Sequence, residues 1–202
     1  FCNEWLAPVP RRSKQIVVAA LRSFLRFLFL KQIIADDLSV HVIGVRLYRE
    51  ENLPKGLPRS EISRVLKLID KDKKNGYRDY AILMLFAEYG IRLSEVLELK
   101  VNDIDWEHDK IRFFRPKSKD YLELPLLPSV GNAIFDYIRK ERSRMKTSAL
   151  FAFPQAEKKA ALQRIVKKHI KKAGITLQPR NSSKVFRHSL AMEMVRQNVP
   201  FK

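Results

Sequence analysis

The residues from Arg78 to Tyr89 form the segment that most constrains the fold. Their middle, AILMLFA, contains no polar side chain, and Gly90 follows at the end. A helix that is apolar on every side is stable in water only when other elements surround it. A glycine suits the left-handed residue that ends many helices. The segment therefore predicts a central, buried helix of one domain, ending at Gly90.

The remaining patterns predict a mainly α-helical fold with one small β-hairpin, an α+β fold, around this helix. Two strands are expected at Lys110–Pro116 and Tyr121–Leu126, on either side of the basic turn KSKD. A short extended piece is expected at Ala149–Phe153. Further helices are expected at 11–35, 60–71, 94–99, 130–144, 157–173 and 183–197.

The charge of the chain indicates a polyanionic partner. Forty Lys and Arg residues against 22 Asp and Glu give a formal net charge of +18. Such an excess repels itself in the compact state, so we expect double-stranded DNA first and an anionic membrane surface second. Arg22, Arg26 and Lys31 interrupt the most apolar stretch, so no membrane span is expected. A single cysteine, Cys2, and no visible signal peptide favour the cytoplasm, at the nucleoid.

Two single cations stand where a phosphate could be bound. Arg92, in the sequence GIRLSE, lies between the central helix and the next one, where its guanidinium fork and backbone N–H groups suit a phosphate. A local ion pair between Arg92 and Glu95 is the alternative. Lys117 lies at the hairpin tip, where a lysine could give a proton to a leaving oxygen. Together with Lys119 it could instead keep the sheet edge in solution.

The last predicted helix carries a third set of polar residues. Lys184, Arg187 and His188 are three and four residues apart, so they share one face of that helix. The cations repel each other unless an anion lies between them. Elsewhere the histidines are scattered, and neither a two-metal set of carboxylates nor a glycine-rich phosphate loop occurs, so no metal or other cofactor is expected.

Taken in this order, the three elements resemble the catalytic domain of tyrosine recombinases, the phage integrase family. The resemblance covers Leu57–Lys202 and lies in the stretches RDYAIL, YGIRLSE, PKSK, LPL and FRHSLA. It implies that Arg92 and Arg187 clamp the scissile phosphate and stabilise its transition-state charge. It also implies that Lys117 protonates the 5′-oxygen leaving group, with Lys119 as the second choice.

One position departs from the family pattern. The family usually carries a histidine three residues before the second arginine, and here that residue is Lys184. This resembles type IB topoisomerases, in which a lysine donates to a non-bridging oxygen. A protonated lysine does not easily act as a base, so the acid–base role of that histidine is not carried over. Glu95 and His188 are expected to support the site without contacting the phosphate.

The nucleophilic tyrosine of the family follows the second arginine box at a greater distance than this sequence covers. Only 15 residues follow Arg187, and all six tyrosines precede it. The resemblance therefore implies that the nucleophile is absent from this sequence. We expect residues 1–202 to bind DNA without cleaving it.

The expected architecture is a two-domain clamp around duplex DNA. Residues 1–40 resemble part of a helical core-binding domain, 41–57 a basic linker, and 58–202 a catalytic domain without its nucleophile segment. The expected function is site-specific recombination, as in phage or transposon integrases, through a 3′-phosphotyrosyl intermediate. The resemblance also implies a homotetramer on DNA, with a dimer on each DNA site. The alternatives are a non-catalytic DNA-binding protein or regulatory fragment and, less favoured, a type IB topoisomerase.

Overall fold

The computed structural model describes residues 11–44, 56–142, 147–176 and 183–199. The chain divides into two compact units, Phe1–Leu53 and Pro54–Lys202. Each unit is described by itself. Among the described residues, no helix has the length and apolar character needed to cross a membrane.

The first unit contains a long helix, α2 (Arg11–Leu30), and a 3-10 helix, η1 (Leu38–His41). α2 is shorter than the predicted range of 11–35, because Gln32 adopts the left-handed conformation with a φ of 59°. The N–H groups of residues 31–33 donate to carbonyl oxygens in the last turn of α2 and so close the helix.

The apolar face of α2 is largely uncovered within the first unit. Arg22 donates from Nε to the carbonyl oxygen of Val42 at 2.8 Å, which holds the segment after η1 against the helix. The exposed large apolar side chains of α2 include Ile16, Val17, Phe24, Phe27 and Leu30. Much of the apolar surface of α2 is therefore free of contacts within the described residues of this unit.

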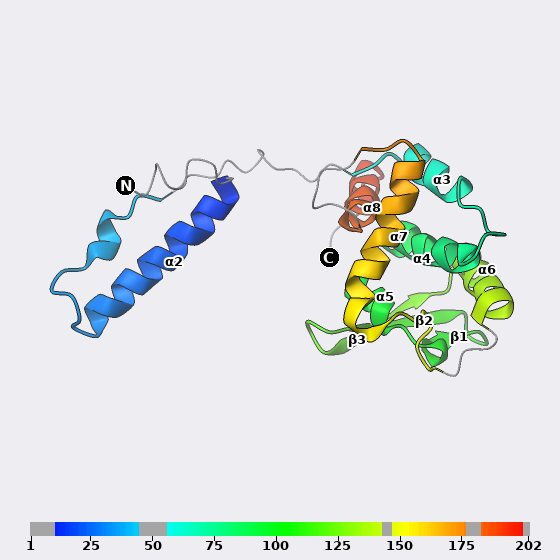
Figure 1. The fold of residues 1–202 in the computed structure, drawn as a ribbon, viewed down its shortest axis with the longest axis horizontal. Coiled ribbons are helices and arrows are strands. Elements are labelled where there is room, and N and C mark those ends of the chain that lie inside the picture. Colours follow the sequence, from blue (N-terminus) through cyan, green and yellow to red (C-terminus); the bar gives the residue numbers. More distant parts are fainter. Residues whose placement is uncertain (1–10, 45–55, 143–146, 177–182, 200–202) are drawn as a thin grey trace. The chain divides into compact units, whose positions relative to one another are not determined.

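The second unit is built around α4 (Gly76–Tyr89), as the sequence predicts. Every side chain of the segment 81–87 is buried. Gly90 ends the helix in the left-handed conformation with a φ of 56°, and its N–H donates to the carbonyl oxygen of Phe86 at 3.1 Å. Figure 1 shows α4 in the middle of this unit, with helices and the small sheet around it.

Among the described residues of the second unit, five further α-helices surround α4. They are α3 (Arg59–Lys67), α5 (Leu93–Glu98), α6 (Pro128–Tyr137), α7 (Lys158–Lys172) and α8 (Lys184–Arg196). A π-helical turn, Ile138–Arg142, extends α6, and 3-10 turns lie at Val101–Asp103 and Gln155–Glu157. In the part of the chain that the structure describes, each predicted helix is confirmed, in the predicted order and with ends that differ by a few residues.

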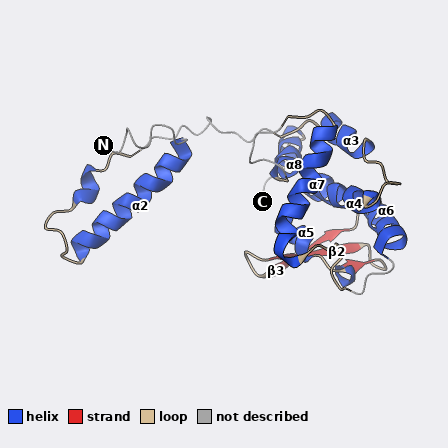
Figure 2. Cartoon of the chain, in the orientation of Figure 1, coloured by secondary structure: helices blue, strands red, loops and turns tan. Residues whose placement is uncertain are grey.

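Three short antiparallel strands, β1 (Ile104–Asp105), β2 (Lys110–Arg115) and β3 (Asp120–Pro125), form one sheet in that order. Figure 2 shows the strands together at one end of the unit. The predicted hairpin is confirmed, whereas β1 was not predicted because two residues carry no readable alternation. In the segment 149–153, which was predicted to be extended, Ala149 forms an isolated bridge with Lys100.

The hydroxyl of Tyr89 fixes the end of α4 to the end of the hairpin. It donates to the carbonyl oxygen of Pro125 at 2.8 Å and accepts from the N–H of Leu127 at 2.9 Å. Burial raises the pKa of Tyr89, so the hydroxyl stays protonated at neutral pH. Its ring packs edge-on against Phe113. The sheet is therefore held against the turn that follows α4.

A buried carboxylate joins α4 to α7. Asp79 is 3 % exposed and lies 2.9 Å from Nε2 of His169, which is itself buried. Arg78 donates to the same carboxylate from Nη2 at 2.9 Å. Burial alone would raise the pKa of Asp79, but the hydrogen bonds from His169 and Arg78 outweigh it and hold the pKa below its usual value.

Replacing Asp79 with alanine is expected to destabilise the second unit by about 3 kcal/mol, because it leaves a buried histidine and a largely buried arginine without their acceptor. Urea unfolding followed by circular dichroism measures the loss. The matched control is Glu157→Ala, which breaks an exposed pair with Arg164 and should cost less than about 1 kcal/mol. Equal losses for the two variants would contradict the structural role of Asp79.

The Asp79 carboxyl also makes the stability of the second unit depend on pH. Its pKa is lower in the folded protein than in the unfolded chain. The stabilisation is therefore complete at neutral pH and is lost as the pH falls below about 4. We expect the difference in Tm between the native chain and Asp79→Asn to narrow when the pH is lowered from neutral. A difference that stays constant to acid pH would contradict the shift.

Candidate phosphate-binding site

Arg92 lies at the junction between α4 and α5, in the extended conformation that precedes a helix. Its backbone N–H and its Nη1 both donate to the carboxylate of Glu95, at 2.6 and 2.8 Å. Glu95 is 2 % exposed, whereas the side chain of Arg92 is about half exposed. The ion pair between Arg92 and Glu95 is thus present. It fixes one edge of the Arg92 guanidinium, and the rest of that side chain faces solvent.

Gly90 brings the second arginine next to this junction. A side chain at Gly90 would lie 3.4 Å from the Cα atom of Arg187 and 3.0 Å from Cδ2 of Leu190. The backbone of α8 therefore passes directly over the residue that ends α4. Arg92 and Arg187, which are far apart in the sequence, belong to adjoining backbone segments for this reason.

α8 is anchored by its apolar residues and presents its cations outward. Phe186 is buried and stacks on Phe86 of α4, with ring centroids 6.2 Å apart. Lys184 and Arg187 are exposed, and His188 is half-buried. None of these three polar side chains has a hydrogen bond or ion pair with another described residue. The face predicted for the last helix is thus formed, with two unpaired cations on it.

Lys117 lies at the tip of the β2–β3 hairpin and is exposed. The tip is formed by residues 116–119, in which Lys119 takes the left-handed conformation with a φ of 57°. The N–H of Lys119 donates to the carbonyl oxygen of Arg115 at 2.8 Å. Neither lysine of the tip pairs with another described side chain.

The β2–β3 hairpin lies close to the Arg92 junction. α5, which begins at Leu93, packs against β2. Hydrogen bonding to Asp120 raises the pKa of Arg115, and the charge of Glu95 raises it further. The structure therefore places α8 beside the turn that precedes Arg92, and it packs α5, which follows Arg92, against β2, the strand that leads to Lys117.

The charges of these side chains suit the binding of an anion. Lys117, Lys184 and Arg187 carry charges that no described residue neutralises, and Arg92 is only partly neutralised by Glu95. A phosphate diester has the negative oxygens that such donors bind most strongly. Among the described residues, no group of three histidine, cysteine or acidic side chains is placed to hold a metal ion.

The residues that the sequence did not single out are Arg115, Asp120 and Ser189. The Ser189 hydroxyl is buried, donates to the carbonyl oxygen of Val185 at 2.7 Å, and accepts from the N–H of Leu57 at 2.6 Å. It therefore ties the start of the second unit to α8. Opposite charges on either side of the KSK turn were the available signal for Arg115 and Asp120.

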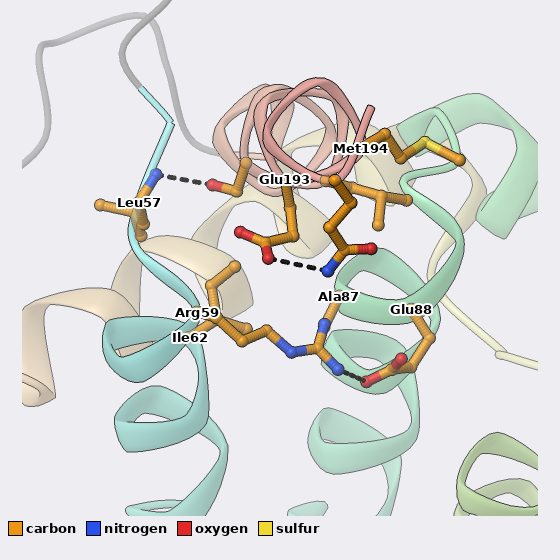
Figure 3. Close-up of a pocket in the computed structure, with 10 residues that line it drawn as sticks. Leu57, Arg59, Ile62, Ala87, Glu88, Glu193 and Met194 are labelled. Atoms are coloured by element: carbon orange, nitrogen blue, oxygen red, sulfur yellow. Dashed lines mark hydrogen bonds and ion pairs between the residues drawn. The ribbon is translucent and has the colours of Figure 1, made fainter. Parts of the chain in front are cut away.

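A pocket of about 310 Å³ lies on another side of α8 and does not serve the phosphate. Figure 3 shows the Arg59–Glu88 ion pair and the Glu193 carboxylate at its wall. None of Arg92, Lys117, Lys184 or Arg187 lines it. Its one lining cation, Arg59, is paired with Glu88, and Glu193 adds a negative charge, so the candidate site is the open cationic face and not this pocket.

The described tyrosines have other partners or lie in packed positions. Tyr89 is bonded to the hairpin end, Tyr137 is buried, and Tyr77 accepts from Lys140. Lys71 lies over the ring of Tyr80, and the ring of Tyr121 packs on Phe114. Tyr48 lies outside the described residues.

Comparison with known proteins places these features in a family. The model of the phage integrase family matches residues 55–202. The putative integrase/recombinase y4rA of Sinorhizobium fredii is 35 % identical over 201 residues, which are 97 % of this chain and 48 % of that protein. A second protein of that organism, y4gC, is 36 % identical over 153 residues, covering 74 % of this chain and 80 % of that protein. The chain thus spans about half the length of y4rA.

Solved structures show the same fold at lower identity. The lambda integrase (residues 75–356) bound to DNA gives a TM-score of 0.73 at 14 % identity and covers 97 % of this chain and 69 % of that one. The XerH site-specific recombinase bound to its difH substrate gives 0.70 at 18 % identity and covers 98 % of this chain and 59 % of that one. By its matched domain and its relatives, the chain belongs to the phage integrase family.

Proposed function

We propose that this chain is the DNA-binding and phosphate-clamping part of a site-specific recombinase that cuts and rejoins duplex DNA through a 3′-phosphotyrosyl intermediate. The observation that carries the proposal is the close approach of α8 to Gly90, which puts Arg187 beside the Arg92 junction. Relatives named integrases and recombinases support it. Solved structures of the same fold with DNA support it as well.

In this proposal Arg92 and Arg187 bind the scissile phosphate from two sides. Charge builds up on the phosphate oxygens in the transition state, and fixed guanidinium groups stabilise it without rearranging. Glu95 fixes the guanidinium of Arg92 and does not contact the phosphate. Lys184 donates to a non-bridging oxygen in place of the family histidine, while His188 supports the helix.

Lys117 is the proposed general acid toward the 5′-oxygen that leaves. An ammonium can both bind an oxyanion and release a proton, which a guanidinium cannot do at physiological pH. The exposed hairpin tip allows Lys117 to reach a duplex lying on the cationic face. No metal or organic cofactor takes part in this proposed chemistry.

The proposed architecture is a clamp, with a helical core-binding part at 1–40, a basic linker at 41–57 and the catalytic part at 58–202. Most of the proposed linker lies outside the described residues. The working assembly is proposed to be a tetramer with a dimer on each DNA site, at the bacterial nucleoid. In this architecture, the uncovered apolar side chains of α2 pack in the interior of the core-binding domain.

Binding of residues 1–202 to duplex DNA is expected to weaken steeply with salt, because Lys and Arg contacts release counterions from the phosphates. With six to ten phosphate contacts, the affinity should fall by about 10³- to 10⁵-fold between about 50 and 200 mM salt. Fluorescence anisotropy with a labelled duplex measures this. An affinity that hardly changes over that range would refute the proposed clamp.

A single substitution tests how much of this salt dependence comes from the candidate site. Arg187→Ala is expected to reduce the slope of log K against log salt by about one unit. Lys73→Ala is the control, because Lys73 lies beside the opposite end of α4 and is exposed. Its removal should leave the slope closer to that of the native chain. If both variants change the slope equally, the proposed contact between Arg187 and the phosphate is refuted.

Residues 1–202 are expected to form no covalent adduct with DNA, because the described tyrosines are engaged elsewhere in the fold. A nicked suicide duplex carrying a site selected with this chain, followed by denaturing electrophoresis, makes the measurement. XerH with its difH site is the positive control. A shifted band with residues 1–202 would show that one of the six tyrosines is a nucleophile.

A further inference from the structure

The tip of the β2–β3 hairpin is closed by one two-pronged ion pair. Arg115 and Asp120 are the last directly opposed residues of the two strands. Nε of Arg115 donates to Oδ1 of Asp120 at 2.9 Å, and Nη2 donates to Oδ2. Two parallel bonds between a guanidinium and a carboxylate fix the orientation of both planes. The pair therefore sets the angle at which the tip leaves the sheet.

The same carboxylate also holds the inside of the tip. The Ser118 hydroxyl donates to Oδ1 of Asp120, and the N–H of Lys119 donates to the carbonyl oxygen of Arg115. Lys117 lies in the sequence between Arg115 and Ser118, one partner from each of these two bonds. All four tip residues, 116–119, are exposed, so packing against the core does not orient them. Their orientation depends on the backbone turn and on Asp120.

Arg115 extends this arrangement toward the first arginine. The charge of Glu95 acts on Arg115, and Glu95 itself holds Arg92 through two hydrogen bonds. Charges thus alternate from Arg92 through Glu95 and Arg115 to Asp120. Each cation in the series is oriented by the carboxylate beside it.

We propose that Arg115 and Asp120 are positioning residues that aim Lys117 at the phosphate held by the two arginines. The inference rests on the proposed function, and it adds a pair to which that function assigns no role. A lysine side chain on a free loop samples many positions and loses its freedom on binding. Fixing the tip in advance reduces this loss. Neither residue needs to contact the DNA for this effect.

A double-mutant cycle in DNA binding tests the proposal with residues 1–202 themselves. Lys117→Ala, Asp120→Asn, the double variant and the native chain are titrated against one labelled duplex at one salt concentration. Asp120→Asn alone changes the net charge and tightens binding in general, but the cycle subtracts this effect. The loss caused by Lys117→Ala should be at least about threefold smaller when Asp120 is already asparagine.

The control removes the same charge from the same strand. Glu123 of β3 pairs with Lys110 at 2.7 Å, near the opposite end of the hairpin, and is about as exposed as Asp120. In the Glu123→Gln background, the loss caused by Lys117→Ala should equal that in the native chain. A change only in folding stability would not produce this contrast. Equal losses in all three backgrounds overturn the positioning role.

A second variant covers the case in which Asp120→Asn does not fold. Arg115→Lys keeps the positive charge but cannot form the two parallel bonds, so it should weaken the dependence on Lys117 in the same way. An undiminished dependence in this variant also overturns the inference. If Lys117→Ala has no effect in the native chain, the proposed role of Lys117 at the phosphate fails first, and the positioning role fails with it.

Discussion

The packing of α8 over Gly90 is the constraint on which the rest of the site depends. The left-handed conformation of Gly90 turns the chain out of the buried helix α4, and the missing side chain leaves room for the backbone of α8. Any larger residue would be strained in that conformation, and its Cβ would lie 3.0 Å from Cδ2 of Leu190 and touch the Cα atom of Arg187. One residue therefore serves two purposes, since it ends the central helix and lets the second arginine approach the first.

Three polar contacts hold the helices and the hairpin of the second unit in place. Tyr89 bonds to the end of the hairpin, and Ser189 joins α8 to the start of the unit. Asp79 ties α7 to the beginning of the same helix. Buried polar groups cost stability unless they find partners, so these contacts specify one arrangement as well as hold it. The cations themselves are left free of such partners, apart from Arg92.

The sequence was sufficient for the central helix, its end at Gly90 and the face of α8, because each depends on local periodicity or on a glycine with one clear use. It also indicated Arg92 and Lys117 through their places next to predicted elements. The sequence did not predict the pair Arg115–Asp120, because only the strand register shows that the two residues face each other. The strand β1 and the shorter end of α2 escaped for a related reason, since two residues carry no pattern and Gln32 is not a typical left-handed residue.

The unpaired cations on α8 also couple the site to the folding equilibrium. Lys184 and Arg187 lie one turn apart and repel each other as long as no anion is bound between them. A ligand that binds only the folded chain shifts that equilibrium in its favour. Phosphate or sulfate should therefore protect the second unit against heat more than chloride does at equal ionic strength, and the choice of buffer becomes part of any measurement of its stability.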